Sequence, residues 1–542
     1  MRRHERDKFF VVDEGVFTGD GTRKRSRPNA QEEIRSFRFS RLGPANEETG
    51  EDSLHTALAT AMTTGTAPDS AGVPAGFTYL GQFVDHDLTM DNTATVLGTE
   101  VTVEELLQGR SPALDLDSLY GRGPDAEPRF YQPDKIRLKT GKTAAVPGDP
   151  VAGRDLDGFD LPRVGEGSTK GARRLAVIPD SRNDENLIVA QTHLAFIRFH
   201  NKIADTLVAQ GMTGAELFAK TRELVTLHYQ WIVRHDFLPR VIDPAIVDDV
   251  FTNGRKLVDA GPGARIDEPP TMPIEFSVAA YRFGHSMVRD QYEWNRFFNS
   301  GAGAITKATL PLLFNFSGTS GTLSPDGKPD DPETGGFERL PTNWCADFRR
   351  LYDFTEAGRD DLKGPGVNLT KRVDSLLVDP LKAVPAGSFN GRGSALDSIE
   401  RNLAFRNLTR ASMVDLATGQ QMAELLGEKP LTASQLLDGD GSGAALKDLA
   451  DDDRDRLVSK TPLWFYILRE AEVNDGKLGA VGGRIVVETF HRAIEASRIS
   501  IVRQPAWRPT LGAEKDVFRM VDLLLFLSDG KEDLLNPLGD PS

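Results

Sequence analysis

The sequence has almost no cysteine and no long apolar run. Cys345 is the single cysteine among 542 residues, so an intrachain disulfide is excluded and a reducing, cytoplasmic setting is the default expectation. No run of about 18 apolar residues occurs, which argues against a transmembrane helix. Before residue 30 the only apolar run is Phe9–Val12, too short for a signal-peptide core, so secretion would need a leaderless route.

Basic residues are also in deficit. Subtracting 80 acidic from 65 basic residues leaves a net charge of -15. A surface of this sign repels phosphate backbones and anionic headgroups, so nucleic acid is not expected as a partner. The proportions of hydrophobic (39%) and charged (27%) residues are ordinary for a folded globular chain, and the length suffices for one large enzyme domain or several smaller ones.

Helical periodicity dominates the apolar pattern. It predicts helices over residues 186–210 and 215–241, and the Val/Ile-rich segment 174–178 is the best candidate for a strand. Four polar stretches rich in Gly and Pro separate the periodic segments, at 13–53, 121–170, 317–342 and 360–398. We therefore expect a mainly α fold with long loops and few short strands.

The segment Asp438–Gly443 begins like an EF-hand loop. Position twelve of that loop is Leu449, where calcium needs a bidentate Glu. We interpret the segment as a turn.

The richest motif is Tyr79–Thr89. Gln82 and His86 are four residues apart and share a helix face, while Asp85 and Asp87 turn away from it by about 100° to either side. One face can therefore serve a cavity while a flank serves a second site. Alternatives are a solvated Asp-His-Asp run, an imidazole held by a carboxylate, or a metal-hydrolase site.

A second motif, residues 179–186, opens the predicted helix that carries His200. Arg182 and Glu185 are three residues apart and can face one cavity. The alternative is helix capping by Asp180 and its neighbours, and both functions are compatible. His200 is interpreted as a structural histidine bonded near Asn201.

Two further motifs carry a histidine and an amide. His285 lies on an apolar helix beside Gly284, which would let a large planar group approach the backbone. Asn407, in the stretch 402–410, could orient such a histidine through its other ring nitrogen. Taken singly, a histidine of this kind is more often a core residue.

In this order and spacing, the four stretches resemble the animal heme peroxidase family of the peroxidase-cyclooxygenase superfamily, over about residues 30 to 500. The resemblance implies a helical catalytic domain over residues 31–510 with heme b buried between the helices that carry His86 and His285. A tail at 1–30, partly disordered, and a C-terminal segment at 511–542 would flank it.

Residue roles follow from the same resemblance. It implies that His86 is the distal base, with Arg182 and Gln82 as its catalytic partners. It also implies that His285 binds the heme iron, supported by Asn407 and Arg282. Asp85 and Glu185 match the positions that form ester bonds to heme in the family. Asn186 replaces the methionine of a third covalent link, so at most a diester is expected.

A calcium site is implied next to the heme. Asp87 would meet the loop 111–121, in which the matching ligands are Ser111, Ala113, Asp115 and Asp117. All of these offer hard oxygen ligands, which calcium prefers. An ion bound by Asp87 would also fix its neighbour His86.

The implied activity is that of a heme-dependent peroxidase. It would reduce hydrogen peroxide through a ferryl intermediate and oxidise halide, thiocyanate or small aromatic donors, in keeping with a role in the response to oxidative stress. A histidine with a pKa near about 6.5 can take and return a proton at neutral pH, and Arg182 supplies fixed positive charge.

Two alternatives remain open. A fatty-acid dioxygenase of the cyclooxygenase kind needs a tyrosine three residues before the proximal histidine, where this chain has Arg282; Tyr281, about 100° round a helix, should point elsewhere. The other is a calcium-binding scaffold without heme.

Overall fold

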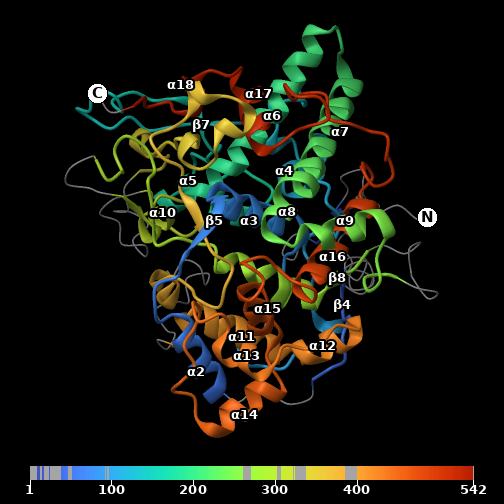
Figure 1. Cartoon of the computed structure of the whole chain (residues 1–542). Coiled ribbons are helices and arrows are strands. Elements are labelled where there is room, and N and C mark those ends of the chain that lie inside the picture. Colours follow the sequence, from blue (N-terminus) through green and yellow to red (C-terminus); the bar gives the residue numbers. More distant parts are fainter. Residues whose placement is uncertain are drawn as a thin grey trace.

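The computed structural model describes residues 38–46, 52–91, 93, 97–260, 270–301, 307–321, 323, 337–384 and 399–540, together with three short strands before residue 25. Within these ranges α-helices and 3-10 turns joined by long loops form most of the molecule (Figure 1). Strands are short and pair mostly in twos. The predicted mainly α fold is confirmed.

Two long helices form the upper part of the molecule in Figure 1. α6 (Leu187–Ala209) and α7 (Gly214–Ile232) pack side by side, and α7 continues through a π-helical turn, Val233–Phe237, into α8 (Leu238–Val241). α17 (Met520–Ser528) covers α6. The helices predicted over 186–210 and 215–241 are therefore confirmed, the second with a π-helical turn within it.

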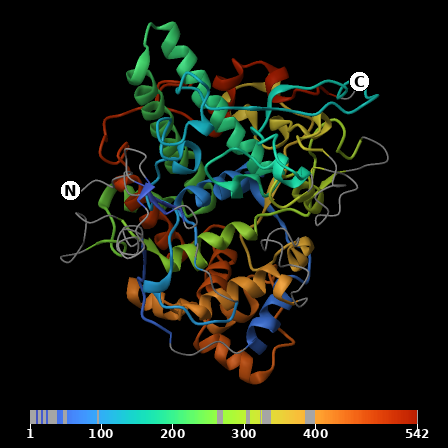
Figure 2. The same ribbon diagram turned by 180° about the vertical axis from the view of Figure 1, so that it is seen from behind.

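The lower part joins an early segment of the chain to two late ones. α2 (Asp52–Met62) packs against α11 (Leu403–Met413) and α14 (Asp451–Ser459), so an early and two late segments share one core. Both views show the blue α2 beside the orange helices (Figures 1 and 2). α15 (Leu463–Glu472) and α12 (Gly419–Leu426) pack together in the same part.

α3 (Gly76–Leu88) lies at the centre, between these parts. It packs against α6 and against the 3-10 turn Ala280–His285, which follows the π-helical turn Glu275–Ala279. α15 and α16 (Gly482–Ala496) support that turn from the other side. Residues Gly76 to Leu88 are mostly buried because both faces of α3 meet other elements.

The strand predicted over 174–178 was wrong. Thr169 caps a short helix, α5 (Lys170–Arg174), by accepting a hydrogen bond from the backbone N–H of Ala172. Only an isolated bridge from Ala176 to Arg163 follows it. The β-branched side chains of this segment had suggested a strand, but capping favours a helical turn just before them.

Most of the tail predicted over 1–30 lies outside the described residues; three strands within it form a small antiparallel sheet. No helix of the described ranges is long and apolar enough to cross a membrane.

The remaining helices are α4 (Asp117–Tyr120), α9 (Pro244–Asn253), α10 (Leu310–Asn315), α13 (Ala433–Asp438) and α18 (Glu532–Leu535). The strands are β1 (Phe9–Val11), β2 (Gly15–Phe17), β3 (Arg23–Lys24), β4 (Phe39–Ser40), β5 (Asp69–Pro74), β6 (Gly141–Lys142), β7 (Asp157–Asp160), β8 (Met272–Pro273), β9 (Gln291–Tyr292), β10 (Ala308–Thr309) and β11 (Leu369–Lys371).

Candidate active site

A cavity of about 390 Å³ lies between α3 and the turn that ends at His285. Residues from both walls line it, and they include every residue that the sequence assigned to the heme: Gln82, Asp85, His86, Arg182, Glu185, Arg282, His285 and Asn407. A smaller hollow of about 210 Å³ shares several of these residues and adds apolar side chains such as Phe39 and Met413. The predicted residues therefore meet in one place.

His86 is buried on the α3 wall of the cavity. Its Nδ1 lies 2.8 Å from Oδ1 of Asn183, and its Nε2 lies 3.6 Å from Oε1 of Glu185. Burial and the neighbouring Arg182 charge lower the pKa of His86 to about 3. The imidazole is therefore neutral at ordinary pH, which a proton acceptor requires.

Arg182 holds a fixed charge beside His86. It lies on the 3-10 turn Ser181–Asp184, and its Nε and Nη2 donate to Asp180 at 3.0 and 2.7 Å. Nη2 also donates to the backbone oxygen of His86 at 3.1 Å. Arg110 donates to the same Asp180 carboxylate at 2.8 Å, and the two arginines hold its pKa well below its usual range. The predicted capping by Asp180 is confirmed, since it accepts from the N–H of Arg182.

On the same wall as His86, hydrogen bonds connect three polar side chains in a row. Asn186 donates to Oε1 of Gln82 at 2.8 Å, and Nε2 of Gln82 donates to Oε1 of Glu185 at 2.5 Å. Burial raises the pKa of Glu185 to about 7. Burial likewise raises the pKa of Asp85, whose carboxylate accepts from the Thr89 hydroxyl at 3.0 Å. Both carboxyl groups are thus easier to keep protonated than exposed ones.

The proximal wall is built differently from the predicted apolar helix. His285 ends a 3-10 turn, in which residues three apart lie above one another, so Arg282 and His285 face the same side. Nη1 of Arg282 donates to Oδ1 of Asn407 at 3.1 Å, and the amide nitrogen of Asn407 lies 2.9 Å from Nδ1 of His285. A Cβ on Gly284 would meet no atom within 4 Å, so the backbone beside His285 is open.

These residues are suited to holding heme. A histidine that binds iron through Nε2 carries a proton on Nδ1, which an amide oxygen accepts. In the structure the amide oxygen of Asn407 accepts from Arg282, so iron binding would require the amide to turn by 180° and give up this bond. Nε2 of His285 makes no hydrogen bond within the described ranges. The two histidines stand on opposite walls, and open backbone at Gly284 leaves room for a planar group.

Tyr281 also lines the cavity, so the expectation that it points elsewhere was wrong. Its ring stacks on Phe276 at 4.8 Å, and its hydroxyl donates to the backbone oxygen of Gly81 on α3 at 3.2 Å. The phenol is therefore bound to the opposite wall.

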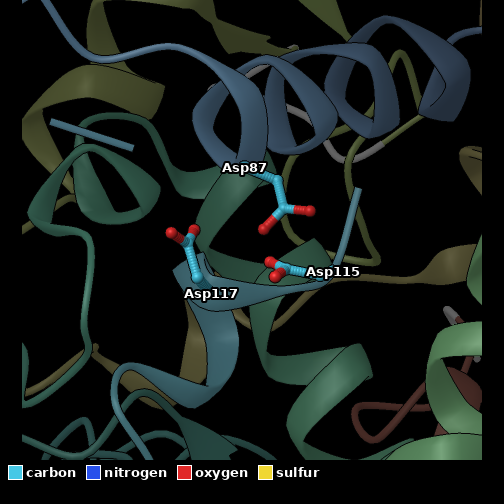
Figure 3. Close-up of side chains that lie close together, drawn as sticks. All are labelled: Asp87, Asp115 and Asp117. Carbon is cyan, nitrogen blue, oxygen red and sulfur yellow. The ribbon is translucent and has the colours of Figure 1, made fainter. Parts of the chain in front are cut away.

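A second cluster lies on the other flank of α3. Asp87, Asp115 and Asp117 are buried, and their nearest oxygens lie within 4.8 Å of one another (Figure 3). Burial and the two neighbouring carboxylates raise the pKa of Asp87 well above its usual range. Three carboxylates at this distance repel one another unless a cation or protons compensate them.

The loop around the cluster carries the other predicted ligands. Ser111 Oγ donates to Oδ1 of Asp115 at 3.3 Å and lies 3.5 Å from the backbone oxygen of Ala113. Tyr229 donates to Asp87 at 3.4 Å, a contact the motifs did not indicate. Of the described residues, no other group of acidic, His or Cys side chains has this geometry. At 438–443 Asp440 pairs with Arg372, consistent with a turn.

Two buried residues near the site were missed by the sequence motifs. Asn183 follows Arg182 directly, so its position was a usable signal. His193 lies ten residues after Asn183, and only packing reveals its contact. His200 has the predicted structural role, but its partners are Tyr120 and the backbone oxygen of Ile136 rather than a group beside Asn201.

Comparisons with known proteins agree on a family. Residues 95–320 match the family model described as "Animal haem peroxidase", a range with Arg182 and His285 but without α3. A peroxidase-like protein of Margaritifera margaritifera is 27% identical over 46% of this chain and 36% of its own length. Human thyroid peroxidase is 26% identical over 36% of this chain and 18% of its own. The matches thus span about a third or less of these relatives.

Solved structures share the fold. Peroxidase A of Dictyostelium discoideum superposes with a TM-score of 0.57 at 15% identity, covering 92% of both chains. A fatty acid alpha-dioxygenase of Arabidopsis thaliana gives a TM-score of 0.55 at 13% identity, covering 93% of this chain and 78% of its own. At such identities the likeness concerns the fold alone, and both enzyme types share it.

Proposed function

Because the chain belongs to the animal haem peroxidase family, we propose that it is a heme-dependent peroxidase that reduces hydrogen peroxide with electrons from a small donor. The observation that carries the proposal is the placement of His86 and His285 on opposite walls of one cavity, with Arg182 beside His86. Heme bound there supplies the redox chemistry.

Each wall has a distinct task. His285 would hold the iron, and Asn407 would orient it through Nδ1. Arg282 lies beside Asn407 on the same wall of the cavity. On the distal wall, Nε2 of His86 would take a proton from one oxygen of hydrogen peroxide, the one that faces the heme. It would then return that proton to the other oxygen, which leaves as water.

Arg182 would stabilise the negative charge that develops on the departing oxygen. Its two bonds to Asp180 and one to the backbone of His86 fix its position before peroxide arrives. Fixed donors of this kind need no rearrangement during the reaction, which is the main source of electrostatic catalysis. Gln82, held by Asn186, would place a water or a halide near His86.

We further propose that Asp85 and Glu185 form esters with the heme. Both line the cavity. An ester would form when a carboxylate oxygen replaces a hydrogen of a heme methyl group, and the substrate hydrogen peroxide would supply the two-electron oxidant for this step. Asn186, in the place of a third link, offers no sulfur to bond with.

We also propose that calcium binds Asp87, Asp115 and Asp117, with Ser111 and the backbone oxygen of Ala113 as further ligands. The support is the buried, mutually repelling carboxylate set in Figure 3. Calcium takes six to eight oxygen ligands in flexible geometry, which this loop can provide.

The donor is proposed to be halide, thiocyanate or a small phenol. Fatty-acid dioxygenation is the second candidate, favoured only by the shared fold of the alpha-dioxygenase. Against it stand Arg282, three residues before His285, and the bond of Tyr281 to the backbone of Gly81.

The decisive experiment is expression with a heme precursor, followed by absorption spectroscopy. We expect a ferric Soret band that shifts with hydrogen peroxide and returns when bromide or a phenol is added. His285→Ala should lose the band, and Asp85→Val combined with Glu185→Val should release heme into acidic organic solvent. A band that ignores peroxide, with oxygen uptake driven by fatty acid, would establish the dioxygenase; absence of heme uptake would leave the calcium-binding scaffold.

A further inference from the structure

Asn183 lies behind His86 and joins it to a second buried histidine. Its Oδ1 is 2.8 Å from Nδ1 of His86, and its Nδ2 is 2.9 Å from Nδ1 of His193. Asn183 and His193 expose none of their surface, and His86 exposes 4%. The three side chains form a sealed row that ends at the cavity.

The chemistry of an amide assigns the protons along this row. With the amide of Asn183 oriented so that its oxygen faces Nδ1 of His86, that nitrogen carries the proton and Nε2 of His86 keeps a lone pair, because an amide oxygen only accepts hydrogen bonds. The amide nitrogen only donates, so Nδ1 of His193 is the acceptor. Asparagine is one of the few side chains that can satisfy both rings at once.

We propose that Asn183 is a positioning residue that holds His86 in the tautomer with its basic Nε2 toward the cavity. The inference rests on the proposed peroxidase function, in which Nε2 accepts the proton of hydrogen peroxide. With the proton on Nε2 instead, His86 has no lone pair to offer on that side. Orientation of a catalytic histidine through its second nitrogen is a general requirement for such a base.

The local backbone supports this role. Asn183 and Arg182 are neighbours on the turn Ser181–Asp184, which Asp180 caps. Asn183 and Arg182 both bond to His86, one to its ring and the other to its backbone oxygen. A single turn therefore positions both the distal charge and the distal base.

Three variants test the inference in the heme-loaded protein. Asn183→Leu preserves volume and removes both hydrogen bonds, while Asn183→Asp keeps an acceptor for His86. Asn201→Leu is the matched control: Asn201, on α6, makes two bonds of 2.8 and 2.9 Å to the backbone of Leu138 and does not line the cavity. Asn183→Ala replaces the leucine variant if that one does not fold.

The first measurement is the rate of the Soret change on rapid mixing with hydrogen peroxide. Asn183→Leu should be slower by about 100-fold or more, the range for loss of a general base. Asn183→Asp should stay within about tenfold of the parent rate, and the control should match it. Carbon monoxide binding to the reduced heme needs no base and should stay unchanged in all of them. A parent-like peroxide rate in Asn183→Leu, or an equal loss in carbon monoxide binding, overturns the proposal.

The second measurement is the ¹⁵N spectrum of the histidine rings, recorded with and without heme. We expect the parent His86 to carry its proton on Nδ1, and Asn183→Leu to mix the two tautomers. A proton on Nε2 in the parent overturns the inference even if the protein is a peroxidase. A proton on Nδ1, together with a heme that ignores peroxide, supports the inference on tautomer control and refutes the proposed function.

Discussion

At the scale of single residues, His285 depends on the group that faces its Nδ1. A neutral amide such as Asn407 gives the ring less imidazolate character than a carboxylate does, which favours a higher potential of the iron it binds. Arg282 beside the amide adds positive charge, and burial together with Arg410 lowers the pKa of Arg282 only to about 10, so it stays charged. In the proposed heme site, the proximal side would therefore favour a strongly oxidising heme.

Asn407→Asp tests this relation. We expect a lower reduction potential of the bound heme, because a carboxylate strengthens the electron donation of His285. Spectroelectrochemical titration measures it, with Asn201→Asp as the control at a distant amide. A potential equal to or above that of the parent would contradict the assigned role of Asn407.

A second residue-scale feature lies away from the cavity. Asp374 is fully buried, and burial together with the nearby Glu472 raises its pKa to about 7. Its Oδ1 accepts from the N–H of Leu376 at 2.7 Å, while its Oδ2 has no hydrogen-bond partner in the described part of the chain. A buried carboxylate in such a place costs free energy when it ionises.

Asp374→Asn should remove that cost. Because the folded pKa lies above the unfolded value, the folded form retains a proton between about pH 4 and 7 that the unfolded form has lost, so stability falls as pH rises through this window. At pH 8 the variant should be more stable by up to roughly 4 kcal/mol, and near pH 3 it should equal the parent. Urea unfolding at both pH values measures it; an equal gain at both would mean that packing, rather than charge, is responsible.

At the scale of elements, α3 unites the two sites. Its 3.6-residue period sends Gln82 and His86 toward the cavity and Asp87 toward the acidic cluster, as the sequence predicted. The loop that leads to α4 and the first residue of that helix then place Asp115 and Asp117 near Asp87. An ion bound there would stiffen the helix turn that carries His86.

Calcium removal is therefore expected to act on both stability and the heme. A ligand present at one hundred times its Kd stabilises the folded form by about 2.7 kcal/mol, so chelation should lower the melting temperature and broaden the Soret band. Asp115→Asn should reduce the bound calcium measured by elemental analysis. Asp438→Asn is the control, because Asp438 is exposed and begins the segment that resembles an EF-hand. It should change neither the melting temperature nor the bound calcium. A loss of bound calcium in this variant would mean that calcium binds at 438–443 and not at Asp87, Asp115 and Asp117.

The segment 275–285 combines two types of helical turn. Its apolar residues are compatible with an α-helix, yet the chain forms a π-helical turn followed by a 3-10 turn. Over so few residues the three periods differ too little to be separated by sequence. Packing of α15 and α16 against the segment decides among them.

At the scale of the whole molecule, the cavity is walled by segments far apart in sequence. α3 and the turn with Arg182 form one wall, while the turn with His285 and α11 form the other. A group that touches all of them would tie the upper and lower parts of Figure 1 together. Heme should therefore stabilise the molecule as a unit.

Heme loading is expected to raise the melting temperature in a single step. At a thousandfold excess over Kd, binding contributes about 4 kcal/mol. Differential scanning calorimetry of loaded and unloaded protein measures the shift, with Asn201→Leu as the control. His285→Ala should abolish it, and an undiminished shift in that variant would show that His285 does not anchor the group.

By itself the sequence determined which residues could do chemistry and on which side of a helix they would lie, because spacing along a regular helix fixes direction without knowledge of the partner. It thus predicted α6 and the two faces of α3. The acidic cluster and the meeting of His86, Arg182 and His285 followed instead from the resemblance to the animal heme peroxidase family, and the structure brings both sets of residues together. Only the tertiary structure decided the contacts between distant segments: the row from His86 through Asn183 to His193, the bond of Tyr281 to Gly81, and the turn geometry before His285. The reason is physical: a hydrogen bond or a local helix type is selected by the free energy of packing against elements hundreds of residues away, and no local pattern records that packing.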